Sequence, residues 1–441
     1  MLPDSDSRDE QRKSEVGSGE GYVTSLLPVA GVCRSTTSAG ALLSGENILC
    51  FALRQWQGAW KNNQQIMSRL SESNRILYIG PPAPLKEAAR KMISGEPRRP
   101  ILERISGNLA VYNEPRLLAR SHMFPQANWA TSRLRMMHVR WLGQRLLGDS
   151  PILWVFDPLA GPLLRRFKTK LFVYHMIDDY QAYFPASARR MRDFSAKWEE
   201  RMLEEADVVF AVSEALHERA LTLNRNSYLV PNGVDYELFQ SALENPELPS
   251  DMRSIRRPII GYVGFIQPTM DFDLLDGLAA EHPFWSFVLV GPTELGVHTE
   301  KFHSLLRRPN VHYLGPKPTS AVPSYVKSCD VCLMPDRERG GSDNLKLYEY
   351  LACGRPVVAL DSPAVRRFDD LLEIARDKKE FAAAIDRSLG ESRELSELRM
   401  RAARAHSWRN RVEAVGKPVR DRLAQTGGVI RPVFVQTSGV S

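Results

Sequence analysis

The residues whose types and spacing most clearly indicate a binding site lie in one segment, Gly340–Leu360 (GGSDNLKLYEYLACGRPVVAL). Either Asp343 or Asn344 can cap a helix that begins near Leu345, and Gly354 is a typical residue at the end of such a helix. A helix N-terminus that follows glycines presents unpaired backbone N–H groups and the positive end of the helix dipole. The segment therefore predicts a binding site for a pyrophosphate group.

Two charged residues complete this predicted site. Lys346 falls in the first turn of the predicted helix, where its ammonium would face the same phosphates. Glu349 lies one turn further along, where a carboxylate can accept hydrogen bonds from both hydroxyls of a ribose. The alternative is a capped surface helix with an ordinary glutamate.

A second set of candidate residues follows the apolar run KLFVYH (Lys170–His175). His175, Asp178 and Asp179 fall at the end of this predicted strand, where the loops of parallel α/β sheets carry chemistry. A carboxylate in this position can act as a general base. Two alternatives stay open: Asp179 as the cap of the following segment, and His175 as a strand-end histidine satisfied by the backbone.

Short apolar strands alternate with helices around both sets, which predicts parallel sheets covered on both faces. In the first half of the chain the predicted strands are Asn47–Leu53, Arg75–Gly80, Leu109–Asn113, Pro151–Phe156, Lys170–His175, Ala206–Ser213 and Ser227–Asn232. The pattern restarts after a polar stretch with PIIGYVGF, SFVLVG, VHYLG, DVCLMP and RPVVAL. We expect an α/β fold of two doubly wound, Rossmann-like domains that face each other across a cleft.

A chain of 441 residues is too long for one ordinary domain. The predicted divisions are a disordered segment 1–45, an N-terminal domain 46–238, a linker 239–257, a C-terminal domain 258–405, a crossover helix 406–423 and a flexible tail 424–441.

The formal net charge is +7, and the excess is concentrated between Ala83 and Arg145, where 12 Lys and Arg residues stand against 4 Asp and Glu residues. Aromatic side chains such as Trp129 and Trp141 lie among them. A solvated helix surface is one interpretation, and a patch that meets an anionic membrane surface or a pyrophosphate-linked lipid is another. No nucleic-acid-binding motif accompanies the patch, so nucleic acid is not an expected partner.

Composition predicts a cytoplasmic protein. Hydrophobic residues make up 43% and charged residues 25%, as in soluble globular chains. The acidic start MLPDSDSRDEQRKSE is unlike a secretory signal, and no apolar run reaches the roughly 18 residues of a transmembrane helix. Five cysteines form no disulfide pattern, and the C-x-x-C of Cys329 and Cys332 lies in a strand-like run. No metal site is expected.

Further segments, taken in chain order, complete a recognisable set: Ala59–Pro82 (AWKNNQQIMSRLSESNRILYIGPP), Leu171–Tyr183, Glu204–Ala220, Val230–Phe239, Gly261–Ile266, Phe287–Pro292, Pro309–Pro318 and His406–Val415. Together with Gly340–Leu360, this set resembles the GT-B glycosyltransferases of the broad "group 1" class, over residues 46–423. That class includes bacterial exopolysaccharide and teichuronic-acid-type enzymes. The resemblance implies an N-terminal acceptor domain and a C-terminal nucleotide-sugar domain.

The resemblance also implies ligands and roles for individual residues. The donor would be a nucleoside diphosphate-sugar, with a UDP-sugar as the first expectation. No further cofactor would be required. The acceptor would be a lipid-linked or polysaccharide glycan. The residues expected to bind the donor are Gly264, Phe265, Arg337, Asn344, Leu345, Lys346 and Glu349. The expected catalytic residues are Asp178 as general base, with Asp179 and His175 beside it.

The chain departs from the class at positions that matter. Gly341 stands where many members carry a first glutamate, and Phe265 and Met270 stand where those members carry an Arg and a Lys. Lys346 is the expected replacement for these cations, with Arg337 and Arg339 as weaker candidates. These departures favour an inverting mechanism.

The expected function is hexosyl or uronosyl transfer in cell-surface polysaccharide biosynthesis, by a cytoplasmic protein peripheral on the inner face of the membrane. Two alternatives stay open: an epimerase of the same fold that acts on nucleotide-sugars, and a non-catalytic scaffold that binds them.

Overall fold

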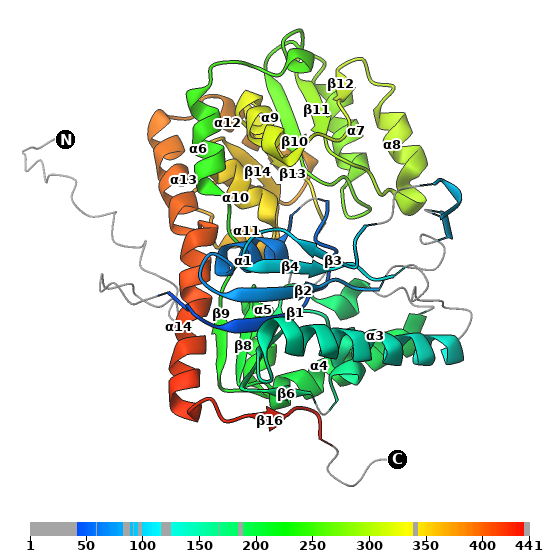
Figure 1. The fold of residues 1–441 in the computed structure, drawn as a ribbon. Coiled ribbons are helices and arrows are strands. Elements are labelled where there is room, and N and C mark those ends of the chain that lie inside the picture. Colours follow the sequence, from blue (N-terminus) through cyan, green and yellow to red (C-terminus); the bar gives the residue numbers. More distant parts are fainter. Residues whose placement is uncertain are drawn as a thin grey trace, which may run out of the picture. The chain divides into compact units, whose positions relative to one another are not determined.

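The structure is a computed structural model that describes residues 42–58, 60–82, 89–90, 92–95, 99–115, 125–165, 167–183, 188–337 and 343–435. These residues belong to one compact unit that holds two large β-sheets and a two-stranded ribbon (Figure 1). The predicted α/β class with two doubly wound sheets is confirmed. The domain boundaries given above stay a prediction.

The first large sheet is built from eight strands of the N-terminal half. They are β1 (Asn47–Phe51), β2 (Arg75–Ile79), β3 (Leu102–Arg104), β4 (Leu109–Tyr112), β5 (Ile152–Val155), β7 (Leu171–Met176), β8 (Val208–Ala211) and β9 (Ser227–Leu229). Their spatial order is β3-β4-β2-β1-β5-β7-β8-β9. Neighbouring strands are parallel except β3, which pairs antiparallel with β4.

Helices cover both faces of this sheet. The side chains of β1, which point alternately to the two faces, show which helices cover each face. The helices are α1 (Asn62–Leu70), α3 (Pro125–Leu147), α4 (Arg189–Glu205) and α5 (Glu214–Leu221), with the 3-10 turns η2 (Pro158–Leu164) and η3 (Tyr180–Tyr183). Leu49 and Phe51 belong to the core cluster that includes side chains of α3 and α4, whereas Ile48 and Cys50 belong to the cluster that includes α1. Because successive strand side chains point to opposite faces, both sides of the sheet are buried.

The second large sheet is wholly parallel. Its strands are β10 (Ile259–Val263), β11 (Ser286–Val290), β12 (Val311–Tyr313), β13 (Val331–Met334), β14 (Val357–Leu360) and β15 (Glu373–Ala375). Their order is β12-β11-β10-β13-β14-β15. The surrounding helices are α6 (Tyr236–Glu244), α7 (Phe272–Glu281), α8 (Thr299–Leu305), α9 (Val322–Ser328), α10 (Leu345–Ala352), α11 (Pro363–Arg366) and α12 (Lys378–Leu389).

Two helices return the chain from the second sheet to the first. Helix α13 (Arg393–Ala405) packs on α10, and α14 (Trp408–Thr426) then contacts α1 and the first sheet. The four apolar residues of α14 that lie in the core cluster of the first sheet are Trp408, Val412, Val415 and Val419. The long red helix in Figure 1 is α14. A helix that crosses back was expected from residue 406, and the structure has one from Trp408.

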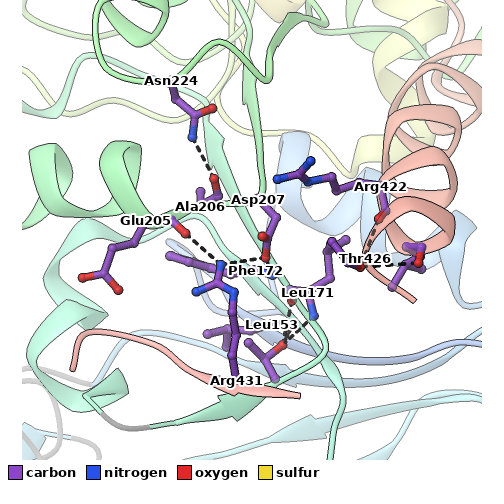
Figure 2. A network of polar contacts seen from close by, with 12 residues as sticks. Leu153, Leu171, Phe172, Glu205, Ala206, Asp207, Asn224, Arg422, Thr426 and Arg431 are labelled. Carbon is purple, nitrogen blue, oxygen red and sulfur yellow. Dashed lines mark hydrogen bonds and ion pairs between the residues drawn. The ribbon is translucent and has the colours of Figure 1, made fainter. Parts of the chain in front are cut away.

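The residues after α14 close onto the first sheet. Strand β16 (Arg431–Pro432) pairs antiparallel with β6 (Lys168–Thr169). Arg431 donates to the carbonyl of Glu205 at 3.0 Å and to Oδ2 of Asp207 at 2.8 Å. Figure 2 shows these contacts as dashed lines. The same Oδ2 accepts the backbone N–H of Phe172 at 2.8 Å, so one carboxylate joins β7 to the C-terminal segment.

This arrangement differs from the flexible tail expected over 424–441. Val433 and Phe434 have no exposed surface, and the Phe434 ring lies edge-on to Phe172 and Trp198. Val433 and Phe434 belong to the short, mostly apolar run 429–435 (VIRPVFV), whose pattern does not distinguish a buried segment from an exposed tail. Residues 436–441 lie outside the described residues, as do 1–41 of the segment expected to be disordered; Leu43, in the described part of that segment, is buried.

Within the described ranges, no helix has both the length and the apolar character needed to cross a bilayer.

Candidate functional site

A cavity of about 1930 Å³ lies between loops of the two large sheets. From the N-terminal half it is lined by residues that follow β1, β2, β4 and β7. From the C-terminal half it is lined by residues that follow β10, β11 and β13, and by the start of α10. All of these loops leave the carboxyl ends of strands, which is where ligands bind in doubly wound sheets.

Helix α10 begins where the sequence predicted and points its first turn at the cavity. Asn344 is the N-cap with extended backbone angles, and Gly354 follows the helix in the left-handed conformation at φ 62°. The hydroxyl of Tyr350 accepts the N–H of Val263 at 2.9 Å and donates to its carbonyl at 3.0 Å. These bonds fix the buried face of α10 to the end of β10. Asn344 and Leu345 both line the cavity.

Asp343, one residue before the cap, joins the two halves of the site. Its carboxylate accepts the N–H of Asn232 at 2.6 Å and the hydroxyl of Tyr348 at 3.0 Å, and it pairs with Arg367. The side-chain amide of Asn232 in turn donates to the carbonyl of Asp343 at 2.8 Å. The turn after β9 is thereby held against the loop that begins α10.

Lys346 lines the cavity but already has a partner. Its Nζ lies 2.6 Å from Oδ2 of Asp336 and 2.6 Å from the hydroxyl of Tyr262. Burial disfavours the charged ammonium, but Asp336 and the Tyr262 hydroxyl outweigh this and raise the pKa of Lys346 above its ordinary value. Lys346 is thus charged, with that charge balanced by Asp336.

Glu349 faces the same cavity from the next turn of α10. Burial raises the pKa of its carboxyl to about 7, against the opposing effect of Lys61 and Lys346. No described residue donates a hydrogen bond to its carboxylate, and part of the surface of Glu349 is exposed. The carboxylate is therefore available to accept hydrogen bonds from a ligand.

Lys61, which the sequence did not indicate as a site residue, lies on the cavity wall formed by the N-terminal half of the protein. It precedes α1 in the loop after β1 and lines the cavity. Burial lowers its pKa, while Glu349 and Asp178 act in the opposite direction. The sequence could have indicated Lys61 through its position between the first strand and the first helix, because loops at the carboxyl ends of strands border the ligand cleft.

Asp178 lines the cavity from the loop after β7, as predicted. Its Oδ1 accepts the backbone N–H of Asp179 at 3.0 Å. Asp179 itself is not among the residues that line the cavity. Its Oδ1 lies 3.3 Å from Nη1 of Arg219, so it serves to hold the loop.

A buried network lies behind this loop. Glu199 of α4 has 2% of its surface exposed and accepts hydrogen bonds from Tyr174, Gln181 and Arg219 at 3.0–3.2 Å. Burial raises the pKa of Glu199, and Arg219 opposes that rise. Since Gln181 belongs to η3 and Arg219 also holds Asp179, the network connects α4 and α5 to the loop that carries Asp178.

His175 is not part of the cavity, contrary to the hypothesis that it orients a substrate. It has no exposed surface, and its ring packs among Trp154, Phe156 and Phe210 on the α1 side of the sheet. Burial lowers its pKa to about 3. Strand β7 runs to Met176, one residue beyond the predicted end, which keeps His175 inside the sheet.

The remaining predicted donor-binding residues line the cavity from the second sheet. Gly264 and Phe265 follow β10, and Arg337 follows β13. The guanidinium of Arg337 pairs with Asp271 at 2.5 Å. The close approach of the loops after β10 and β11 requires a glycine at 291, because a Cβ there would lie 1.9 Å from the carbonyl oxygen of Gly264. Gly341 and Arg339 lie outside the described residues.

Each half of the chain matches the model of a family of sugar-transferring enzymes. Residues 257–391 match the family described as "Glycosyl transferases group 1", and residues 93–238 match "Glycosyltransferase Family 4". A protein of Bacillus subtilis (strain 168) named "Putative teichuronic acid biosynthesis glycosyltransferase TuaH" is 29% identical over 278 residues. That match covers 59% of this chain and 70% of the relative.

Solved structures of the same fold cover most of the chain. Sucrose-phosphate synthase from Thermosynechococcus elongatus aligns with a TM-score of 0.66 at 18% identity, covering 86% of this chain and all (100%) of that one. A trehalose-6-phosphate protein of E. coli bound with UDP-2-fluoro glucose has a TM-score of 0.62 at 15% identity, covering 86% and 99%. HepE of Anabaena, in complex with UDP and glucose, has a TM-score of 0.59 at 14% identity, covering 86% and 100%.

Proposed function

Since the chain belongs to the group 1 glycosyltransferases of the GT-B fold, we propose that it transfers a sugar from a UDP-sugar to a lipid-linked or polysaccharide acceptor in cell-surface polysaccharide biosynthesis. The observation that carries the proposal is the start of α10, where Glu349 opens on the cavity from one side while Asp178 opens on it from the other. The donor assignment draws on the UDP compounds bound to HepE and to the E. coli protein, and the pathway draws on the name of the Bacillus relative.

The donor would bind along α10. The carboxylate of Glu349 would accept hydrogen bonds from the ribose hydroxyls, and the backbone N–H groups at the start of the helix would face the diphosphate. Lys346 would add positive charge, moderated by its pairing with Asp336. The contact between Tyr350 and Val263 supports this role, because it fixes the helix start relative to the end of β10.

Asp178 is the proposed general base of an inverting transfer. As the acceptor hydroxyl oxygen attacks the anomeric carbon, its proton would pass to the Asp178 carboxylate and the nucleoside diphosphate would leave with the bonding electron pair. The position of Asp178 at the carboxyl end of β7, on the cavity wall, supports this role. The description of the Bacillus relative as a transferase favours this reaction over epimerisation or mere binding.

The test uses purified protein, a panel of UDP-sugars and glycan acceptors, and two variants. Asp178→Asn should lower the turnover number by about a hundredfold or more with donor affinity kept. Glu349→Ala should instead lower donor affinity by about tenfold or more, since it removes charge-assisted hydrogen bonds. Asp273→Asn, at another carboxylate on the cavity wall, is the control. Full turnover in Asp178→Asn, or an epimer formed from donor alone, would contradict the proposal.

We also propose that the protein works in the cytoplasm, peripheral on the inner face of the membrane. One face of α3 supports this: Leu134, Met137 and Trp141 are 55%, 66% and 52% exposed and recur at helical spacing. Exposed arginines flank them, and the guanidinium of Arg145 lies 5.4 Å from the centre of the Trp141 ring. Apolar side chains bordered by cations can bind an anionic lipid surface, because the apolar groups are buried among the lipids and the cations are attracted to the negative headgroups.

Sedimentation with vesicles that contain anionic lipid, at low salt, tests this surface. We expect the wild-type protein to sediment and the pair Met137→Ser with Trp141→Ser to bind about tenfold more weakly. Phe284→Ser is a matched control, because Phe284 is 66% exposed and has Arg256 against its ring. A wild-type protein that stays in the supernatant would rule the surface out.

A further inference from the structure

The cations that line the cavity fall into two groups by their partners. Those of the C-terminal half pair with carboxylates: Lys301 with Asp273, Lys317 with Asp251, Arg337 with Asp271 and Lys346 with Asp336. On the N-terminal half, Arg99 lies 3.9 Å from Glu103. Each of these cations therefore already has an anionic neighbour before any ligand arrives.

Arg54 and Lys61 are different. Both line the cavity from the loop after β1, and within the described residues no carboxylate lies in ion-pair distance of either side chain. No hydrogen bond between either charged group and a described residue is present either. They are thus the two cations of this wall whose charge is not already balanced by a partner.

Lys61 also lies within electrostatic range of the donor-binding helix. Lys346 and Glu349 of α10 both contribute to its titration, as do Asp178 and Arg54. Lys61 lowers the pKa of Glu349 in return. A ligand group at the start of α10 would therefore lie within the field of Lys61, and the same field reaches the proposed base.

A diphosphate brings negative charge that the C-terminal half does not balance alone. Lys346 shares its charge with Asp336, and Phe265 and Met270, which follow β10, are uncharged. Charge on the diphosphate grows further as the bond to the sugar breaks, so uncompensated cations near the leaving group favour transfer. Arg54 and Lys61 have the position and the unbalanced charge for this.

We propose that Lys61 and Arg54 form the subsite that binds the diphosphate of the donor, facing the start of α10 from the N-terminal half of the protein. This inference rests on the proposed function and deepens it. The ribose is held by one half and the diphosphate charge by the other, so the donor itself bridges the cavity. Both halves are then needed for donor affinity, not only for the acceptor.

The experiment measures binding of UDP, uridine and inorganic pyrophosphate to the full chain by calorimetry. We expect Lys61→Gln and Arg54→Gln each to weaken UDP binding by about tenfold and to change uridine binding far less, because uridine has no phosphate. Lys61→Arg should restore UDP binding. The dependence of UDP affinity on salt should be shallower in the Gln variants than in the wild type, which a merely structural defect would not produce.

Lys301→Gln is the matched control, since Lys301 lines the same cavity but pairs with Asp273. UDP affinities of the Arg54 and Lys61 variants equal to that of this control would overturn the subsite while leaving the proposed function intact. The subsite is equally overturned if these variants bind UDP normally and lose affinity only for a phosphate-bearing acceptor. Failure of the wild type to bind UDP or any nucleotide-sugar would overturn the proposed function and the subsite together.

Discussion

The ionisation of Glu349 depends on its position on the cavity wall. Its carboxyl is largely enclosed, which raises its pKa to about 7, yet it faces a cavity and not a hydrophobic core. The positive charges of Lys61 and Lys346 limit this rise in pKa. The group is thus poised between its neutral and charged forms near neutral pH, and a ligand that donates hydrogen bonds to it stabilises the charged form.

The stability of the protein should reveal this shift. The pKa of this carboxyl is about 7 in the folded protein and 4.5 in the unfolded chain, so the folded protein binds the proton more tightly. This difference stabilises the fold fully below pH 4.5, and the stabilisation is lost as the pH rises through 7. Glu349→Gln does not titrate, so it should match the wild type at pH 4 and be more stable at pH 8, by about 1–2 kcal/mol in free energy of unfolding. Urea unfolding at both pH values measures the difference.

Glu247→Gln is the control for that measurement, because Glu247 is exposed and should give no difference at either pH. A Glu349→Gln variant that is less stable than the wild type at pH 8 would contradict the raised pKa.

Placement on the cavity wall was predictable for residues that belong to a local sequence pattern. Lys346 and Glu349 sit on a capped helix after glycines, and Asp178 follows an apolar strand; all three line the cavity. The burial of His175 was not predicted, because the end of the strand decides whether this residue lies inside the sheet, and β7 ends at Met176, one residue later than expected. Lys61 was missed because its role depends on groups distant in sequence, such as Glu349.

Among the elements, the loop after β7 depends on two helices for its shape. Arg219 of α5 holds both Glu199 of α4 and Asp179 of the loop, with N–O distances of 3.1–3.3 Å. Gln181 of η3 adds a bond to Glu199 at 3.0 Å. The proposed base is therefore positioned by a buried ion pair that does not itself reach the cavity.

Arg219→Met should uncouple these elements. Removal of the guanidinium leaves the buried Glu199 uncompensated, so we expect the free energy of unfolding to fall by about 3 kcal/mol. Turnover should fall while donor affinity stays, because only the loop that carries Asp178 is disturbed. Chemical denaturation and steady-state kinetics check these expectations.

Arg189→Met serves as the comparison, since Arg189 forms an exposed pair with Asp193 on the same helix α4. Such a pair contributes under about 1 kcal/mol. Equal effects of the two substitutions would show that the network behind the loop stabilises the protein no more than an exposed ion pair does.

The apolar strands were predictable as elements, and the short polar ones were not. Strands β5 and β7 are continuous buried runs and were placed to within a residue or two. Strands β3 (LER) and β15 (EIA) are three residues long and carry a charged side chain, so neither periodicity nor composition distinguishes them from loops. Their strand character comes from pairing with a neighbour that is already in place.

At the scale of the whole molecule, the C-terminal residues complete the N-terminal half. After α14, the chain adds β16 to β6 and inserts Phe434 into the core cluster that contains Phe172. Arg431 and Asp207 bind each other beside it. The first sheet is therefore not a self-contained product of the first half of the chain.

Phe434→Ala should cost about 3 kcal/mol or more of unfolding free energy, because it leaves a cavity between Phe172 and Trp198. Val435→Ala is the control, since Val435 is 48% exposed. Thermal or urea unfolding compares the two. A loss no larger for Phe434→Ala than for the control would mean that the C-terminal segment packs on the sheet without stabilising it.

The insertion of Phe434 also bears on how the protein is made. During translation, the strands of the first sheet leave the ribosome long before residue 434 does. Domains generally fold in the order in which they are translated. Until that residue arrives, a nascent chain exposes the aromatic faces of Phe172 and Trp198 that it will cover. Stalled or truncated translation products should therefore be the forms of this protein that chaperones hold longest.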